Sequence, residues 1–218
     1  MNYLRLASAV LALGIISIGC VSSIPLNSSL NDFVSMGTKV NSKADISFSY
    51  SSSVVDSVFK PYTKDKQAVN TSHPGFQMAP SATLKKMVTE YISNKFSKLS
   101  DSSTTKLSVG VKDFWIEQYS TDSKGAQVMV ALAGGETNLL CVAKVKVEVK
   151  MVKDSQEIVK ILSPSSEANF VYGVGTGTAT SNVYQGQNSI ENVHAKNINT
   201  LFNKVIMMMN SFLEENGL

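Results

Sequence analysis

The sequence predicts an α+β fold: an antiparallel sheet of four or five strands with two helices packed on one face. The clearest observation is the segment NLLCVAKVKVEVKMVKD at 138–154, where apolar residues alternate with charged ones. This alternation is typical of a strand with one buried and one solvated face. Two other segments, 81–99 and 190–212, place apolar residues at helical spacing. Helices of this kind cover the apolar face of such a sheet.

We divide the chain of 218 residues into a lipoprotein signal peptide at 1–19, a flexible tether at 20–43 and a single α+β periplasmic domain at 44–218. The tether is predicted because VSSIPLNSSLNDFVSMGTKVNSK is rich in serine and asparagine and has few apolar clusters. The remaining length is enough for one domain with its own hydrophobic core.

The domain begins with the strand DISFSYSS, in which Ile46, Phe48 and Tyr50 share one face. A loop over 53–80 follows, and the first helix then starts with Ser81 as its N-cap. The apolar stripe of this helix consists of Leu84, Met87, Val88, Tyr91, Ile92, Phe96 and Leu99. The polar segment SDSSTT ends the helix.

Three strands are predicted after this helix. In KLSVGVKDFWIEQYS the apolar phase changes by one residue, which predicts a β-bulge near Lys112 and Asp113. AQVMVALAGG at 126–135 is the second strand, and 138–154 is the third. The segment EIVKILSPSSEANFVYGV is predicted to add another strand, which is interrupted at Pro164.

The last helix follows a loop rich in glycine, threonine, serine and asparagine. Glu191 in its first turn favours the helix dipole, and Gly217 suits its termination. Its apolar stripe consists of Ile190, Val193, His194, Ile198, Leu201, Phe202, Val205, Ile206, Met209 and Phe212. At least one residue of Met207, Met208 and Met209 is expected to be exposed, because successive helix residues point in different directions.

The N-terminus has the layout of a secretory signal peptide. Arg5 is the only charge before an apolar run from Leu6 to Ile18, and Gly19 and Cys20 end that run. A transmembrane helix needs about 20 apolar residues, so the run is too short to span a membrane. The motif SIGC resembles the lipobox of bacterial lipoproteins, in which the cysteine thiol is acylated and the leader is removed. We therefore predict lipidation at Cys20; an ordinary signal peptide with a coincidental cysteine is the alternative.

Resemblance to known lipoproteins also implies a location and a class of function. In enterobacterial lipoproteins an aspartate after the cysteine favours the inner membrane, and Val21 stands at that position here. The resemblance therefore implies lipid anchoring on the periplasmic face of the outer membrane. The element order, with ATLKKMVTEYISNKFSKL and NINTLFNKVIMMMNSFL as helices, resembles small outer-membrane lipoproteins of the YajG type. It is also similar to the lipoprotein partner of the lipopolysaccharide-export barrel and to the N-terminal domain of TolB. In these families the domain is a binding or assembly module rather than an enzyme.

We predict no catalytic, cofactor-binding or metal-ligating residue. GVGTGTAT lacks the Gly-Lys-Ser/Thr ending of a phosphate loop and is predicted to be a flexible connector. His73 and His194 have no metal-ligand spacing, and His194 is predicted to make a hydrogen-bonded contact between helix and sheet. Asp113 and Glu117 flank Trp115 and share one face if the strand is regular. A glycan-hydrolysing carboxylate pair also needs a defined separation and a cleft.

Charge and cysteine content exclude further classes. The net charge of +3 is spread along the chain, which excludes a basic surface for nucleic acid. Cys141 lies on the apolar phase of its strand and is predicted to be a buried, inert thiol; a reactive or intermolecular thiol is the alternative.

The sequence indicates a lipid-anchored cell-envelope lipoprotein that is not an enzyme and needs no cofactor. It is expected to act as a binding or assembly module for an envelope protein complex of transport, secretion or motility. Its partners are the membrane, through N-terminal acyl chains, and an envelope protein. The alternative is a binder or carrier of a small lipid or glycan at the outer membrane, with its site in the cleft between helices and sheet.

Lipidation at Cys20 predicts a simple outcome for Cys20→Ser. The wild-type protein is expected to incorporate labelled fatty acid and to partition into detergent, because two or three acyl chains give stable anchoring. Cys20→Ser should block both acylation and removal of the leader, so the fatty-acid label is lost. The uncut precursor then stays held by its leader, or it is cut elsewhere and released as soluble protein. The control Cys141→Ser should change neither label nor partitioning. Fatty-acid label that survives Cys20→Ser would contradict the prediction.

Overall fold

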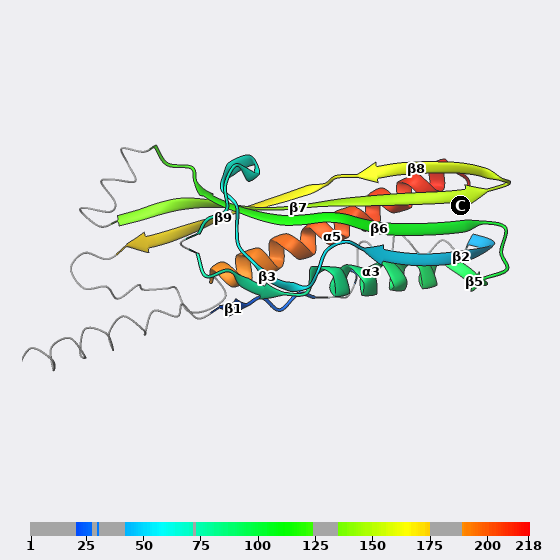
Figure 1. The fold of residues 1–218 in the computed structure, drawn as a ribbon, viewed down its shortest axis with the longest axis horizontal. Helices are drawn as coiled ribbons and strands as arrows, with labels where there is room; N and C mark the ends of the chain where they lie inside the picture. Colours follow the sequence, from blue (N-terminus) through cyan, green and yellow to red (C-terminus); the bar gives the residue numbers. More distant parts are fainter. Residues whose placement is uncertain (1–20, 28–29, 31–41, 72, 124–134, 175–188) are drawn as a thin grey trace, which may run out of the picture.

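The computed structural model describes residues 21–27, 30, 42–71, 73–123, 135–174 and 189–218. Figure 1 shows an elongated domain in which a long sheet lies over two helices. The predicted strand AQVMVALAGG, except for Gly135, lies outside the described residues. Most of the predicted connector before the last helix also lies outside them.

The main sheet has six strands in the described part of the chain: β2 (Ser42–Ser52), β5 (Phe96–Leu99), β6 (Lys106–Ser120), β7 (Gly135–Lys153), β8 (Gln156–Leu162) and β9 (Ser165–Val174). The strand order is β5-β2-β6-β7-β8, and β9 also pairs with β7. β2 is parallel to β5 and β6, whereas the other pairs are antiparallel. The α+β class is confirmed, but the sheet is mixed and larger than predicted. Helix α3 (Pro80–Lys95) is part of the connection from β2 to β5 and returns the chain to the end of the sheet where β2 begins. A crossover connection of this kind makes the two strands parallel.

β7 is the longest strand of this sheet in the described residues, with 19 residues. Its second half pairs with β8 and its first half with β9. The break between β8 and β9 falls at Ser163 and Pro164, which confirms the predicted interruption. β6 follows β7 along its whole length, with a register shift between Val111 and Asp113. The predicted bulge is therefore confirmed, and Lys112 is its extra residue.

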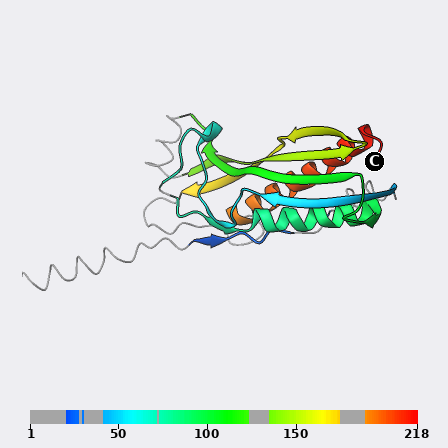
Figure 2. The ribbon, with the colours of Figure 1, turned by 45° about the vertical axis from the view of Figure 1, so that its right-hand side comes forward.

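One face of β7 forms the core of the domain. Its buried side chains are Cys141, Ala143, Val145, Val147, Val149 and Met151. Helix α3 and helix α5 (Ile190–Glu215) lie on this side of the sheet, as Figures 1 and 2 show. The opposite face carries Lys144, Lys146, Glu148 and Lys150, none of which is buried. Both the two-faced strand and the placement of the helices on one side agree with the prediction.

The start of α3 differs from the prediction. The N-cap is Ala79, whose side chain makes no capping hydrogen bond, and Ser81 lies inside the first turn. The carboxylate of Asp56 instead accepts hydrogen bonds from the backbone N–H of Ser81 at 2.8 Å and of Ala82 at 3.0 Å. A carboxylate at this end also interacts favourably with the helix dipole. A residue distant in sequence therefore replaces the predicted N-cap.

The end of α3 also differs from the prediction. The helix stops at Lys95, because Phe96 adopts an extended conformation with φ −109° and ψ 134°. Phe96 and Leu99 belong to β5, which pairs with β2. Phe96 remains buried, whereas Leu99 is 46% exposed. Strand pairing at this position overrides the helical periodicity of the sequence.

The limits of α5 agree with the prediction. Ser189 is the N-cap, and its side chain accepts a backbone hydrogen bond at 3.3 Å. Glu191 lies in the first turn. At the other end Gly217 has a φ of +72°, which allows Leu218 N–H to bond to Leu213 O at 2.9 Å.

The middle of α5 has one exposed side. Met207 and Met208 are exposed, whereas Met209 is fully buried, as the helical geometry predicts. Neither this helix nor the other in the described residues is long and apolar enough to cross a membrane.

A second, smaller sheet joins the N-terminal segment to the domain. It consists of β1 (Ser22–Ser23), β4 (Phe76–Met78) and β3 (Ser57–Phe59), in the order β1-β4-β3. β1 is parallel to β4, and β3 is antiparallel to it. Ile24 and Leu30 are buried in the core. The described part of the segment expected to be a tether is therefore packed on the domain.

The two faces of β7 predict opposite effects of substitution. Val147→Asp should lower the free energy of unfolding by about 4 kcal/mol or more, because it buries an unpaired charge. Lys146→Thr should change it by less than about 1 kcal/mol, since Lys146 is exposed and threonine suits a strand. Urea unfolding measures both values, and similar destabilisation by the two variants would contradict the assignment of the faces.

Candidate functional site

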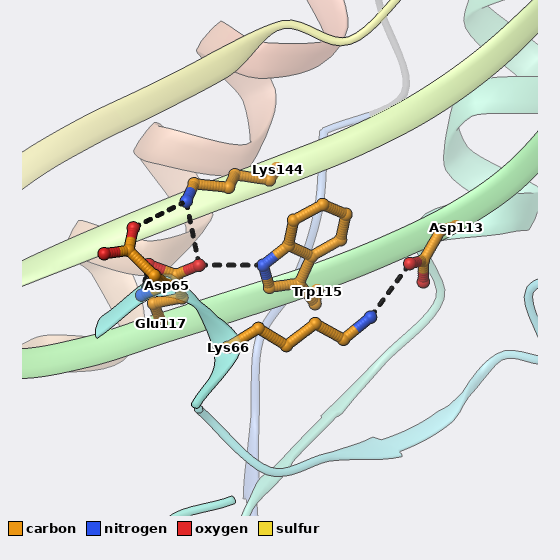
Figure 3. Close-up of polar contacts among 6 residues, drawn as sticks. All are labelled: Asp65, Lys66, Asp113, Trp115, Glu117 and Lys144. Atoms are coloured by element: carbon orange, nitrogen blue, oxygen red, sulfur yellow. Dashed lines mark hydrogen bonds and ion pairs between the residues drawn. The ribbon is translucent and has the colours of Figure 1, made fainter. Parts of the chain in front are cut away.

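Five side chains surround the single tryptophan on the outer face of the main sheet, away from α3 and α5 (Figure 3). We call these residues together the Trp115 cluster: Asp65, Lys66, Asp113, Trp115, Glu117 and Lys144. Three of these residues come from β6, one from β7 and two from the 3-10 turn η1 (Lys64–Lys66).

The bulge in β6 determines which side chains reach this face. After the register shift at Lys112, β6 presents Asp113, Trp115 and Glu117 outward in alternation. Trp115 lies opposite Lys144 of β7. The prediction that the two carboxylates share a face with the tryptophan between them is confirmed.

The turn η1 reaches the cluster because one edge of β6 is free of β2 beyond the bulge. Tyr62 N–H donates to Ile116 O at 2.8 Å, and Gln118 N–H donates to Tyr62 O at 2.8 Å. Asp65 and Lys66 follow with φ values of +55° and +56°. This left-handed conformation is rare for such residues and turns the chain back over the sheet. Sequence periodicity gave no signal for this contact, because η1 lies in the segment predicted to be a loop.

Glu117 is the buried centre of the cluster, with 1% of its side chain exposed. Its carboxylate accepts hydrogen bonds from Trp115 Nε1 at 2.9 Å, Lys144 Nζ at 2.9 Å and the Asp65 backbone N–H at 3.2 Å. Burial raises the pKa of this carboxyl, but the hydrogen bonds and the charge of Lys144 together lower the pKa below its usual value. Glu117 is therefore ionised at neutral pH and is not a general acid.

The tryptophan ring lies near two ammonium groups. Lys66 Nζ is 4.5 Å from the ring centroid and Lys144 Nζ is 5.9 Å from it. Lys66 Nζ also donates to Asp113 Oδ2 at 2.9 Å. The charges of the cluster are thus paired with one another around the ring. This arrangement fixes side chains for contact, and it offers no free acid or base for proton transfer.

The two histidines come together around one phenylalanine of β4. The Phe76 ring lies 4.6 Å from the His73 ring and 4.9 Å from the His194 ring, between centroids. His194 is fully buried, and its Nε2 lies 3.4 Å from Gln118 Oε1 of β6. The predicted helix–sheet contact is therefore confirmed. Burial lowers the pKa of His194 to about 4, so its ring is neutral at neutral pH.

The other predicted residues are placed as follows. Cys141 is fully buried, which confirms the predicted burial, and this burial raises the pKa of its thiol to about 12. Cys20 lies outside the described residues. Within the described ranges, no three His, Cys, Asp or Glu side chains are grouped so that they could hold a metal ion.

A polar contact that the sequence does not predict joins the two helices. The Lys95 side chain is 1% exposed, and its Nζ donates to Asn210 Oδ1 at 3.1 Å and lies 3.8 Å from Glu214 Oε1. Tyr91 OH donates to the same Asn210 oxygen at 3.0 Å. Burial lowers the pKa of Lys95, and the carboxylate of Glu214 opposes that effect. The contact satisfies the polar groups where α3 and α5 meet.

A polar pocket of about 410 Å³ opens between α5 and β9. It is lined by Ser166, Glu167, Ala168, Asn169, Asn192, Val193, Lys196, Asn197 and Thr200. Asn197 is 2% exposed and donates through Nδ2 to Cys141 O at 2.9 Å. Its Oδ1 has no hydrogen-bond partner among the described residues. The sequence analysis did not select Asn197 as a site residue. The pattern that could have indicated it is an asparagine next to the apolar stripe of a helix.

No model of a known protein family matches the chain, and no curated protein sequence matches it. Its structure is similar to that of a DUF330 protein from Xanthomonas campestris, with a TM-score of 0.48, 10% identity and coverage of 91% of this chain and 100% of that one. For a minor lipoprotein from Acinetobacter baumannii the TM-score is 0.39 and the identity 12%, and the match covers 78% of this chain and 93% of that one. For the rare lipoprotein B from Shewanella oneidensis the TM-score is 0.35 and the identity 15%, and the match covers 79% of this chain and 97% of that one.

Two of these three structures are lipoproteins by description. With TM-scores below 0.5 and identities of at most 15%, the similarities carry no conclusion about family or activity. The resemblance to YajG-type lipoproteins stays a prediction.

The Trp115 cluster predicts a pH-dependent contribution to stability. Glu117→Gln should lower the free energy of unfolding by about 1–2 kcal/mol at neutral pH, because a buried hydrogen-bonded charge is lost while the part-exposed Lys144 stays hydrated. In the wild type this contribution is complete above the ordinary glutamate pKa of about 4.5. It is lost as the pH falls through the lower value of the folded state.

Urea unfolding followed by Trp115 fluorescence measures this effect. The difference between wild type and Glu117→Gln should shrink as the pH is lowered. The control Glu157→Gln removes an exposed ion pair with Lys150 and should change stability by less than about 0.5 kcal/mol. A difference that stays constant down to low pH would contradict the role of Glu117.

Proposed function

We propose that the protein is a lipid-anchored lipoprotein of the bacterial cell envelope and a non-enzymatic binding or assembly module for an envelope protein complex. The Trp115 cluster is the contact surface in this proposal. The observation that carries it is a part-exposed tryptophan held in a fixed position on the face of the sheet opposite α3 and α5.

The geometry of the cluster supports a role in protein contact. Tryptophan is among the residues that contribute most to binding energy at protein interfaces. Trp115 is already fixed by Glu117 on one side and by Lys66 above its ring, so binding would order few additional side chains. Lys66 and Asp113 keep 37% and 45% of their side chains exposed and provide a polar rim.

The state of the ionisable groups supports binding rather than catalysis. Glu117 and Asp113 are engaged in ion pairs, and Glu117 accepts three hydrogen bonds. The Cys141 thiol is protonated because it is buried, and the His194 ring is neutral and enclosed. None of these groups is placed as a nucleophile next to a base.

The anchor and the location come from the N-terminus. The leader at 1–19 and the motif SIGC support acylation of Cys20, and Val21 after it supports the outer membrane. In this proposal the acyl chains hold the domain on the periplasmic face of that membrane.

The pocket between α5 and β9 favours a second candidate, the binding of a small glycan. Its lining of serine, threonine, asparagine, lysine and glutamate side chains suits a hydroxylated ligand better than an apolar one. Asn197 lies in the lining of this pocket, and its Nδ2 donates a hydrogen bond to Cys141 O at 2.9 Å. The site is a cleft between helix and sheet, where the sequence places the alternative function.

Trp115→Ala tests the proposed contact surface. The full-length lipoprotein, tagged at its C-terminus and purified from detergent-solubilised envelopes, should retain one stoichiometric protein partner. Trp115→Ala should reduce that partner at least about tenfold, since loss of a central aromatic costs about 2 kcal/mol or more of binding. Val159→Ala is the control. Val159 belongs to β8, is exposed on the same outer face of the sheet as Trp115, and lies away from the Trp115 cluster.

Two outcomes would contradict the proposal. Equal recovery of the partner with Trp115→Ala and Val159→Ala would exclude the Trp115 cluster as the contact surface. A purified lipoprotein without a protein partner that carries a glycan, lost on Asn197→Leu, would favour the second candidate.

A further inference from the structure

We infer that the outer face of the β1-β4-β3 sheet lies against the lipid surface that anchors the protein. The inference rests on the proposed acylation of Cys20. It goes further, because it assigns one face of the folded domain to the membrane and fixes the orientation of the molecule.

The first argument is the length of chain between the anchor and the fold. β1 begins at Ser22, so Val21 alone separates it from Cys20. Consecutive Cα atoms are about 3.8 Å apart, so the Cα atom of Cys20 lies within about 8 Å of that of Ser22. An acylated Cys20 must therefore hold the start of β1 at the membrane surface.

The second argument is that β1 is fixed to the domain. Ser22 and Ser23 pair with Phe76 and Gln77 of β4, and Ile24 N–H donates to Gln77 O at 2.9 Å. Ile24 is 3% exposed and belongs to the hydrophobic core. The domain therefore cannot swing freely about its anchor, and the sheet that contains β1 stays next to the lipid.

The third argument is the chemistry of the outer face. The register places Ser23, Gln77 and Val58 side by side on the face opposite the buried Phe76. Val58 is 42% exposed. Gly75, with φ +99°, passes so close that an added Cβ would lie 2.6 Å from Val58 Cγ1.

Neighbouring residues extend the same surface. Val21, two residues before Ser23, is 44% exposed. Lys60 lies beside Gly75, since an added Cβ there would be 3.3 Å from Lys60 Cγ, and it is exposed. The carboxylate of Asp56 is engaged in two hydrogen bonds from the first turn of α3. Exposed valines with a lysine suit a shallow contact with lipid headgroups.

The contact needs little affinity of its own. A few part-exposed valines do not hold a soluble domain on a membrane, but the acyl chains supply the attachment. Once the domain is attached, contact of this face with lipid becomes intramolecular and is favoured by a high effective concentration.

This orientation turns the Trp115 cluster away from the membrane. Phe76 of β4 packs on His194 of α5, and His194 in turn contacts Gln118 of β6. β4 thus packs on α5, while Phe59 of β3 contacts Phe114 of β6 directly, with ring centroids 5.4 Å apart. Figures 1 and 2 show β1 and η1 on opposite sides of the domain. A lipid-facing β1-β4-β3 sheet leaves the outer face of the main sheet accessible from the periplasm.

The test uses the full-length lipoprotein in vesicles of phosphatidylethanolamine and phosphatidylglycerol. Val58→Cys is labelled with an environment-sensitive fluorophore, and Val159→Cys on the outer face of β8 is the matched control, with a similar exposure of 48%. Cys141 is buried and should not react with the fluorophore. Labelling of the wild-type protein checks this. The label at 58 should emit at shorter wavelength and be quenched by nitroxide-bearing lipid several-fold more than the label at 159.

Flotation of the vesicles separates the two hypotheses. Protein that floats with the vesicles but shows equal quenching at 58 and 159 would overturn the orientation and leave the anchor intact. Protein that does not float, or that incorporates labelled fatty acid equally well as Cys20→Ser, would overturn the anchor itself.

Discussion

The two-sided pattern of β7 is the constraint on which the rest of the structure depends. Its side chains alternate between the core and the outer face, and both β6 and the pair β8 and β9 are registered on it. A slip of one residue would turn Lys144 and Lys146 into the core and Val145 out of it, which no other part of the fold could compensate. The helices then have only one face to cover.

That constraint also produces the outer surface. The bulge at Lys112 changes the phase of β6 relative to β7, so Phe114 and Ile116 enter the core and Trp115 and Glu117 point out. The free edge of β6 beyond β2 then accepts Tyr62, and η1 closes over the ring. The Trp115 cluster therefore arises from strand register, the edge of β6 that β2 leaves free, and the ion pair between buried Glu117 and part-exposed Lys144.

Where local pattern and structure disagree, a contact distant in sequence explains the difference. Helical spacing extends to Leu99, but the chain leaves the helix at Phe96 because β2 offers a strand to pair with. Ser81 has a capping side chain, yet Asp56 provides the cap through two hydrogen bonds. The parallel pairing of β2 depends on a crossover through α3, which periodicity cannot reveal because it reports faces and not neighbours.

The sequence by itself determined the α+β class, the faces of β7 and α5, the bulge, the break at Pro164, the burial of Cys141 and the shared face of Asp113 and Glu117. Each of these follows from side-chain periodicity or from local backbone chemistry. Only the tertiary structure decided the mixed strand order, the packing of β1 on the domain, the partners of Glu117 and the unpartnered Asn197 Oδ1. Those features depend on residues brought together from distant segments, and their pairing is selected by the free energy of the whole fold rather than by any local pattern.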